Sequence, residues 1–354
     1  MKLQKIAALT AAVMVCSAVA GCGGAKPAET TAAPAETQTE AAAETQAEAA
    51  PEAEAAAFEP QENLEFVVGS GAGGGADVFT REIVSIIEKN GWYPKNITVT
   101  NKPGSGHVVG YTYLMEQAND YTINVTASSF MSQPLAGNSP FTFDDFKYVA
   151  LLVKDPSLLV ASPQSGLKTM DEVVAFAQEH PGELMCGGSN AISDDAILVN
   201  QINEAYGIDI TYVTLESGSD VITDVMGGHV DLAFGSPSEI GDNVAAGNCT
   251  AIAAVSDVRL DYPGMEEIPT FLELGKEITH QQHRGFVMAG AASDEAVAYY
   301  SDLILRAAET DEWKEFMKEN CMNPFVKDSE GYKAYIPELA EVYRENIEKI
   351  QANQ

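Results

Sequence analysis

The sequence predicts an α/β fold with mostly parallel sheets. Short apolar runs rich in β-branched residues alternate with helical patterns along most of the chain, as is typical of strands that are joined through helices. The region after residue 62 spans about 290 residues, which is long enough for two ordinary domains with their own cores. A glycine-rich turn between an apolar run and a helical pattern supports the same class, because such folds bind ligands beyond the carboxyl ends of strands.

Nine apolar runs are predicted to form strands, and they cover residues 64–68, 97–100, 121–127, 148–153, 158–161, 184–186, 210–215, 231–234 and 251–255. Helical periodicity predicts helices from about residue 77 and over residues 108–117, 170–178, 194–206, 221–226, 239–245, 295–308, 312–319 and 331–350. The last third of the chain is therefore expected to be rich in helix.

The stretch from Leu64 to Arg81 joins the first predicted strand to the first predicted helix. Five of the seven residues 69–75 are glycines, and a helical apolar pattern begins near Asp77. Glycines permit positive φ angles and let a ligand approach the backbone, while the unpaired N–H groups of a helix N-terminus attract anions. We therefore predict an anion-binding loop, since a turn that only packs a helix on a sheet needs one glycine.

The same glycines fit the dinucleotide-binding pattern Gly-x-Gly-x-x-Gly through Gly69, Gly71 and Gly74. That pattern requires an acidic residue at the end of the next strand. The next predicted strand instead runs into Asn101 and Lys102. An exported dinucleotide-binding lobe is thus the alternative interpretation, and a solute-binding loop is the preferred one.

The N-terminal residues predict export. Two lysines precede an apolar segment that is too short for a comfortable membrane span and that ends in Val-Ala-Gly-Cys at Cys22. This ending resembles the lipobox of bacterial lipoproteins, which implies a signal peptide at residues 1–21 and lipidation of Cys22. Residues 22–62 are mostly Ala, Glu, Thr and Pro, so we expect a disordered acidic tether. The expected location is the extracytoplasmic face of the cell membrane, by way of the lipid anchor.

Composition argues against several functions. The formal net charge of −32 opposes nucleic acid and anionic lipid as partners. The cysteines at 186, 249 and 321 are too far apart for a disulfide scaffold or a zinc site, although one disulfide among them stays open. His280 and His283 lack the glutamate of a zinc protease motif and are expected on the solvated surface. Without a Gly-x-Ser-x-Gly elbow, we expect neither an enzyme nor a cofactor nor a metal.

Five short motifs follow one another along the folded region. They are Gly-Gly-Gly-Ala-Asp-Val at 73–78 with Arg81 after it, Asn-Lys-Pro-Gly-Ser-Gly at 101–106, Asp-Tyr-Thr at 120–122, Gly-Gly-His-Val-Asp-Leu at 227–232, and Pro-Thr-Phe-Leu-Glu-Leu-Gly at 269–275 with Arg259 ten residues before it. Together they resemble the solute-binding proteins of tripartite tricarboxylate transporters, the TctC or Bug family. The resemblance covers nearly everything from Leu64 to the C-terminus.

This resemblance implies a two-lobed, type II periplasmic-binding-protein fold, with lobe 1 at residues 64–161 plus 281–354 and lobe 2 at residues 162–280. It also implies that the protein captures a small carboxylate by hinge closure near Ala161 and Gln281 and delivers it to membrane permease subunits. We expect the receptor to be a monomer. Arg284 lies near the second crossing between the lobes, where it either supplies a cation to the cleft or pairs with surface acids.

The predicted ligand-binding residues follow strand ends in both lobes. They are Ser70, Gly71, Gly73, Gly74, Gly75 and Asp77 in the first loop, Ser128 and Ser129, the group Gly188, Ser189, Asn190 and Ser193, and Ser236. In the family, backbone N–H groups of the glycine-aspartate loop hold one carboxylate and the second lobe holds the other end of the ligand. Asp77 is expected to cap its helix, because its carboxylate would repel an anion.

The chain departs from the family pattern in ways that leave the substrate open. Gly69 and Ser70 stand where a proline and an aromatic are usual, and His107 stands where a glycine is usual. Residues 213–216 lack the aromatic and the cation that the family places in the second lobe. These changes leave room for a ligand less acidic than a tricarboxylate, and a sensor lobe without transport is a second alternative.

Overall fold

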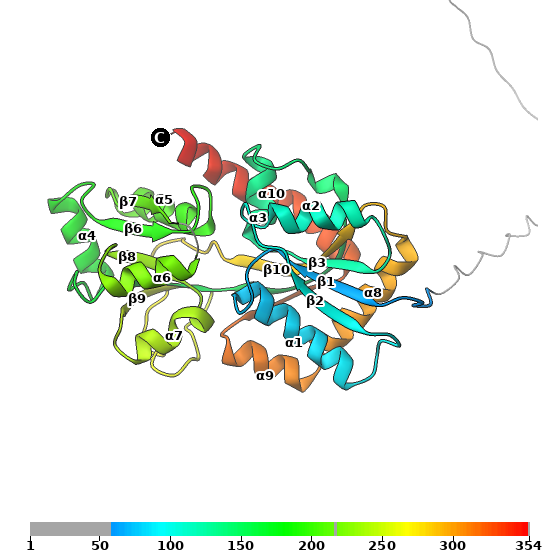
Figure 1. Cartoon of the computed structure of the whole chain (residues 1–354). Coiled ribbons are helices and arrows are strands. Elements are labelled where there is room, and N and C mark those ends of the chain that lie inside the picture. The colour runs from blue at the N-terminus through cyan, green and yellow to red at the C-terminus, as the bar shows by residue number, and fades with distance from the viewer. Residues whose placement is uncertain (1–57, 216–217, 353–354) are drawn as a thin grey trace, which may run out of the picture. The chain divides into compact units, whose positions relative to one another are not determined.

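The computed structural model describes residues 58–215 and 218–352, which form two β-sheets surrounded by helices (Figure 1). The α/β class expected from the sequence is confirmed. The predicted signal peptide, Cys22 and most of the tether lie outside the described residues. Every described helix is too short or too polar to span a lipid bilayer.

The first sheet has six strands in the order β11, β4, β10, β3, β1, β2. Their bounds are β1 Leu64–Val68, β2 Ile97–Asn101, β3 Thr122–Val125, β4 Phe146–Asp155, β10 Gln282–Ala289 and β11 Asn323–Lys327. Strand β1 is parallel to β2 and β3. Strand β10 is antiparallel to both of its neighbours, and β11 is antiparallel to β4.

The second sheet has five strands in the order β7, β6, β8, β5, β9. Their bounds are β5 Ser157–Ala161, β6 Met185–Gly188, β7 Thr211–Thr214, β8 Leu232–Gly235 and β9 Thr250–Val255. Strand β6 is parallel to β7 and β8, whereas β5 is antiparallel to β8 and β9.

Ten α-helices connect or cover the strands of the described region. They are α1 Gly75–Lys89, α2 Val108–Gln117, α3 Ser128–Leu135, α4 Met170–Glu179, α5 Asp194–Tyr206, α6 Gly218–Gly227, α7 Pro237–Ala245, α8 Asp294–Ala308, α9 Asp311–Glu319 and α10 Ser329–Ala352. A short 3₁₀ helix covers Phe143–Asp145. Helix α10 packs against α3 beside the first sheet and against α5 beside the second, so it links the two halves.

Both sheets are mixed, which corrects the expectation of mostly parallel sheets. The chain leaves the first sheet along β4, enters the second through β5, and returns along β10 beside β4. Two neighbouring strands that carry the chain in opposite directions must pair antiparallel. The outward crossing falls at Pro156, between β4 and β5. It therefore precedes β5, whereas we expected it near Ala161, and the lobe boundaries themselves stay a prediction.

Two strands and one α-helix were not predicted from the sequence patterns. Strand β10 begins with polar residues and was taken as part of a crossing, although its apolar second half lies at the centre of the first sheet. Helix α3 contains Pro134 and three serines, and these residues have low helix propensity, so the sequence did not predict a helix there. Strand β11 contains Pro324, which is tolerated because β11 is an edge strand.

The first sheet meets an aromatic core on the side of α1. Phe66 and Phe79 both contact Phe286 of β10, with ring centroids 5.5 Å apart in each pair, and Trp313 is completely buried against Phe79. A register shift after Arg284 brings β10 close to β4 at Gly285. A Cβ atom there would lie 2.4 Å from the carbonyl oxygen of Ala150, so this crossing strand requires glycine.

Candidate functional site

The loop between β1 and α1 is held in place by Asp77. Its Oδ2 accepts hydrogen bonds from the Gly73 N–H and from Arg81 Nε, both at 2.9 Å, and its Oδ1 accepts one from Asn101 Nδ2 at 2.9 Å. Burial would raise the pKa of Asp77, but the bonds from Arg81, Gly73 and Asn101 outweigh it and lower the pKa. Both carboxylate oxygens are thus engaged within the loop, and Asp77 fixes the backbone that would meet a ligand.

The N-terminus of α1 is open to a ligand. Its N-cap residue is Gly74, whose backbone is extended and which supplies no side-chain cap. Within the described part of the chain, the N–H groups of Gly75 and Ala76 have no hydrogen-bond partner. Unpaired N–H groups at a helix N-terminus favour an anion by about 0.3 to 2 kcal/mol. Among the predicted glycines, Gly75 therefore presents a free donor, whereas the N–H groups of Gly73 and Gly74 are bonded to Asp77 Oδ2 and to the Gly71 carbonyl.

A buried ion pair lies directly beside this helix end. Arg284 of β10 donates from Nε and Nη2 to Asp155 Oδ2 at 2.8 and 2.5 Å, and the two residues are 5% and 2% exposed. A Cβ atom on Gly75 would lie 2.8 Å from Arg284 Nη2. The partner of Arg284 is thus a buried carboxylate at the outward crossing, and the alternative that Arg284 pairs with surface acids is wrong.

Several buried polar groups lie next to the loop between β1 and α1. Ser70 Oγ, His107 Nδ1 and both side-chain polar atoms of Asn124 are buried without a hydrogen-bond partner. His107 lies against Gly69, where a Cβ atom would come 2.6 Å from the histidine Cβ. Burial, with Arg284 adding to it, lowers the pKa of His107 to about 4. His107 is therefore neutral at pH 7 and adds no charge beneath the loop.

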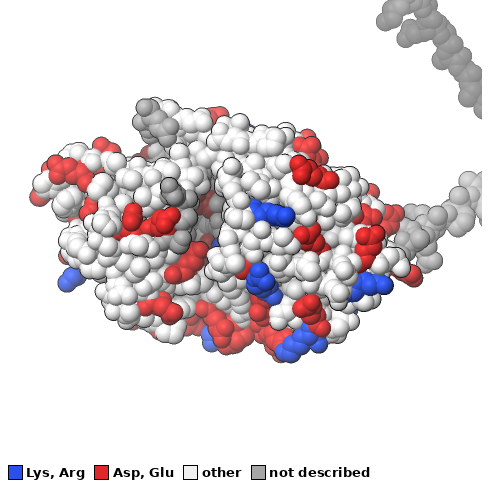
Figure 2. All heavy atoms as spheres, in the orientation of Figure 1, with Lys and Arg blue, Asp and Glu red and all other residues white. Residues whose placement is uncertain are grey.

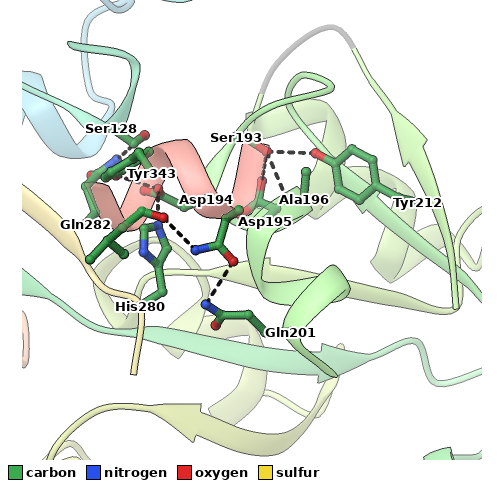
Figure 3. Close-up of polar contacts among 12 residues, drawn as sticks. Ser128, Ser193, Asp194, Asp195, Ala196, Gln201, Tyr212, His280, Gln282 and Tyr343 are labelled. Carbon is green, nitrogen blue, oxygen red and sulfur yellow. Dashed lines mark hydrogen bonds and ion pairs between the residues drawn. The ribbon is translucent and has the colours of Figure 1, made fainter. Parts of the chain in front are cut away.

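The second sheet contributes the loop from Gly188 to the start of α5. Ser193 is the N-cap of α5 and accepts from the Ala196 N–H. Tyr212 of β7 shares a hydrogen bond with Ser193 Oγ and donates to the Asn190 carbonyl, both at 2.8 Å. Figure 3 shows Tyr212 reaching Ser193 from β7. Residues 213–216 lack the aromatic of the family pattern, but Tyr212, just before that stretch, places an aromatic side chain against this loop.

The fourth predicted position, Ser236, begins α7. Its N–H and Oγ both contact Glu239 Oε2, at 3.3 and 2.9 Å. The other oxygen of Glu239, Oε1, lies 3.6 Å from where a Cβ atom on Gly75 would stand. The N-termini of α1 and α7, which belong to different sheets, therefore face each other. Figure 2 shows a groove between the two halves, with acidic side chains along its lower part.

A buried polar cluster at the first residue of α5 joins the two halves. Asp194 Oδ1 lies 2.8 Å from His280 Nε2 and accepts from Tyr343 Oη of α10 at 2.7 Å, as Figure 3 shows. Burial raises the pKa of Asp194, but the contacts with His280, Tyr343 and Ser128 lower it by more. The pKa of Asp194 therefore lies below its ordinary value. His280 is 7% exposed, so the expectation that it is solvated is wrong. It was missed because Asp194 is distant in sequence.

Asp195, next to this cluster, has an elevated pKa. Burial, together with the charges of Asp194 and Glu239, raises its pKa to about 7. The native state then holds a proton that the unfolded chain has lost above its ordinary pKa of 3.8. The free energy of unfolding contributed by this group is therefore highest near pH 4 and falls as the pH rises toward 7.

Replacing Asp195 with asparagine is expected to remove the loss of stability that this carboxyl group causes as the pH rises. At pH 8 the variant should be more stable than the wild type by about 1 to 2 kcal/mol. This gain is smaller than the rise in the pKa of Asp195 implies, because the side chain is partly exposed to solvent. At pH 4 the two proteins should be equally stable. Urea unfolding at both pH values, followed by circular dichroism, measures the difference, and an equal gain at both pH values would contradict the titration.

Other features of the described residues do not point to a second kind of site. Two hollows of about 440 and 460 Å³ lie beside β11 and beside α1 and β2, at the outer edges of the first sheet and away from the facing helix N-termini. The described residues hold no group of three His, Cys, Asp or Glu side chains that could bind a metal ion. Cys186, Cys249 and Cys321 are buried and free, which settles the open question of a disulfide.

Two α/β sheets whose helix N-termini meet across a groove define a solute-binding protein of the periplasmic type. The model of the family described as "Tripartite tricarboxylate transporter family receptor" matches residues 90–351. The chain belongs to this family, as the motifs indicated. Its members are substrate-binding receptors and not enzymes, which confirms that expectation.

Individual relatives agree with this assignment. The "UPF0065 protein in gbd 5'region" of Cupriavidus necator is 25% identical over 296 residues, covering 82% of this chain and 88% of the relative. Two solved Rhodopseudomonas palustris proteins share the fold at 18% identity, each covering 82% of this chain and 98% of its own. One, solved with adipate, has a TM-score of 0.74, and the other, MatC with bound malate, has a TM-score of 0.66.

Proposed function

We propose that this protein is a lipid-anchored extracytoplasmic receptor that captures a small carboxylate between two lobes and delivers it to a tripartite tricarboxylate transporter permease. The observation that carries the proposal is the open N-terminus of α1, where Gly75 and Ala76 present unpaired N–H groups beside Arg284. Family membership and the relatives solved with adipate and malate support a carboxylate as the ligand.

The lobes in this proposal are the halves that carry the two sheets, joined by the crossings at Pro156 and between β9 and β10. A ligand that touches both α1 and α7 favours the closed arrangement by the contacts it makes only there. The predicted anchor at Cys22 and the acidic tether would hold this receptor near its permease. We include the predicted residues Ser128, Ser129, Ser189 and Asn190 in the proposed site.

Gly75→Ala provides the test of the carboxylate site. The new methyl group would meet Arg284, which is held by Asp155 and cannot move freely. We expect carboxylate affinity to fall about tenfold or more, which corresponds to about 1.4 kcal/mol. Isothermal titration calorimetry of the purified full-length protein against mono-, di- and tricarboxylates measures this, with adipate and malate as the first probes.

Gly227→Ala is the matched control. Gly227 is the last residue of α6, and the atoms nearest to a Cβ there belong to the exposed ring of His229. This variant should bind like the wild type. Binding of nucleotides in place of carboxylates would instead support the dinucleotide alternative, and equal affinities of the wild type and Gly75→Ala would remove the α1 N-terminus from the site.

A further inference from the structure

Helix α10 contacts both halves of the described structure. Near its start, Tyr332 shares a hydrogen bond of 3.0 Å with Thr126 Oγ1 of the first-sheet half, and its ring lies edge-on to Tyr148 with centroids 5.0 Å apart. Toward its end, the helix packs along α5, which connects β6 to β7 in the second sheet. Figure 1 shows this end of α10, in red, beside α5. A single helix therefore spans the two halves without being one of the two crossings of the chain.

Three polar contacts join α10 to α5 along their length. They connect Tyr343 Oη to Asp194 Oδ1 at 2.7 Å, Gln201 Nε2 to Asn346 Oδ1 at 3.3 Å, and Lys349 Nζ to Glu204 Oε2 at 2.9 Å. The members on α5 are seven and three positions apart, so they share one face of that helix. Residue numbers rise together along the two helices, which therefore run parallel where they touch.

The two helices also share buried apolar surface. Ile197 of α5 lies in the same buried cluster as Tyr343 and Ile347 of α10, together with core residues of the first sheet. On the other face of α5, Leu198 and Ile202 lie in the core of the second sheet. Helix α5 is thus packed into both cores, and an apolar contact of this kind resists the separation of two domains.

The side of the second sheet that carries α6 and α7 is joined to the first half differently. Among the described residues, its apolar cluster contains one buried residue of the first half, Cys321, and otherwise only residues of the second half. The N-termini of α1 and α7 meet through polar groups, with Glu239 Oε1 facing Gly75. In Figure 1, α5 and α10 lie on the opposite side of the sheets from α1 and α7. The halves are therefore held together along α10 and can part along the groove.

The second crossing of the chain enters the contact between α5 and α10. His280 lies two residues before β10, and its Nε2 is 2.8 Å from Asp194 Oδ1, the oxygen that also accepts from Tyr343. The His280 ring lies edge-on to the Tyr343 ring, with centroids 4.8 Å apart, and Figure 3 shows the three side chains together. Asp194 is the first residue of α5. One carboxylate oxygen therefore ties the start of this helix to both the crossing and α10.

We propose that α5 and α10 form the pivot of the receptor, a contact that stays packed while the groove between the N-termini of α1 and α7 opens and closes. This inference rests on the proposed function, because the movement serves the capture of a solute. Tyr343 and His280 hold the first residue of α5, so the loop at Ser193 keeps its place relative to the first sheet in both arrangements. Helix α10 is then a third, non-covalent connection beside the two crossings of the chain.

A covalent bridge across the pivot tests this proposal. Glu204→Cys and Lys349→Cys place thiols at two half-exposed positions, and a short bismaleimide joins them in a full-length chain that also carries Cys16→Ser and Cys22→Ser. The other three cysteines are buried. We expect the bridged protein to bind malate and adipate within about twofold of the same variant with separately capped thiols, as measured by calorimetry. A change of about tenfold or more in either direction would overturn the proposal, because the contact would then differ between the free and bound states.

Small-angle X-ray scattering of the ligand-free protein gives a readout that needs no ligand. The radius of gyration should be the same with and without the bridge. A smaller radius in the bridged protein would show that α5 leaves α10 when the groove opens, which contradicts a pivot there. If the wild type binds no carboxylate, the proposed function fails, and scattering still decides whether this contact stays closed.

Tyr343→Phe tests the polar tie while keeping the aromatic ring. Amide hydrogen exchange at residues 190–197 should become about tenfold faster, as expected for the loss of a hydrogen bond to a charged group, while exchange in β1 and α1 stays unchanged. Tyr335→Phe is the matched control, because Tyr335 lies on the same helix but its Oη lies 3.2 Å from His283 Nε2 of β10. Unchanged exchange at residues 190–197 in Tyr343→Phe, or an equal increase in the control, would show that Tyr343 does not hold the start of α5.

Discussion

Replacing Arg284 with methionine is expected to lower the free energy of unfolding by about 3 to 5 kcal/mol. The substitution removes the cation but leaves Asp155 buried at 2% exposure between the two sheets. An unpaired carboxylate there must be ionised without compensation or take up a proton. Equilibrium urea unfolding of the full-length protein, monitored by circular dichroism, measures the loss.

The pH dependence separates this explanation from a simple packing defect. Burial already raises the pKa of Asp155 in the wild type, and Arg284 counteracts that rise. Without Arg284 the pKa should rise further, so the native variant binds a proton that the unfolded chain has released. The deficit should therefore be larger at pH 8 than at pH 5. A deficit of the same size at both pH values would mean that lost packing dominates.

An exposed ion pair provides the matched control. Arg259 donates from Nε to both oxygens of Glu273 at 2.8 and 2.9 Å, yet both side chains are 44% exposed. Arg259→Met should cost only about 0 to 1 kcal/mol, because water solvates whichever partner remains. The contrast between these two arginines rests on burial, since each makes two contacts of 2.5 to 2.9 Å with its carboxylate.

Local sequence was enough to locate the first half of the site. An apolar run, five glycines and a helical pattern follow one another within residues 64–81, and these short-range signals predict a strand, a bare turn and an open helix N-terminus. The other predicted positions, at Ser128, Ser193 and Ser236, also begin helices α3, α5 and α7. Strand ends and helix starts are encoded locally, so they could be read from the sequence.

The partners of these residues depend on contacts between distant segments and could not be predicted. Asp155 meets Arg284 only because β10 returns beside β4. His280 is buried only because Asp194 and Tyr343 converge on it from α5 and α10. The direction of β10, and with it the mixed character of the first sheet, follows from the chain crossing twice between the sheets. The polar residues that begin β10 form no local pattern from which this return of the chain to the first sheet could be predicted.

Gly188→Ala is expected to lower the free energy of unfolding by about 2 to 3 kcal/mol, near the upper end for over-packing. The new Cβ atom would lie 2.0 Å from Tyr212 Oη and 2.5 Å from its Cζ. Tyr212 cannot turn aside without breaking its bonds to Ser193 and Asn190. Because that phenol holds the loop before α5, we also expect weaker ligand binding by the protein that remains folded, measured by calorimetry beside the unfolding experiment.

Gly187→Ala, the neighbouring substitution in β6, distinguishes a local clash from a general loss of strand glycine. The atoms nearest to a Cβ atom at Gly187 are side-chain atoms of Leu215 and Val230, at 3.2 Å, and these can shift by a few tenths of an ångström. It should be clearly milder than Gly188→Ala. Combining Gly188→Ala with Tyr212→Leu should restore part of the lost stability but not the binding, because the clash is relieved while Ser193 and Asn190 lose their partner. Full recovery of binding in the double variant would show that Tyr212 does not position this loop.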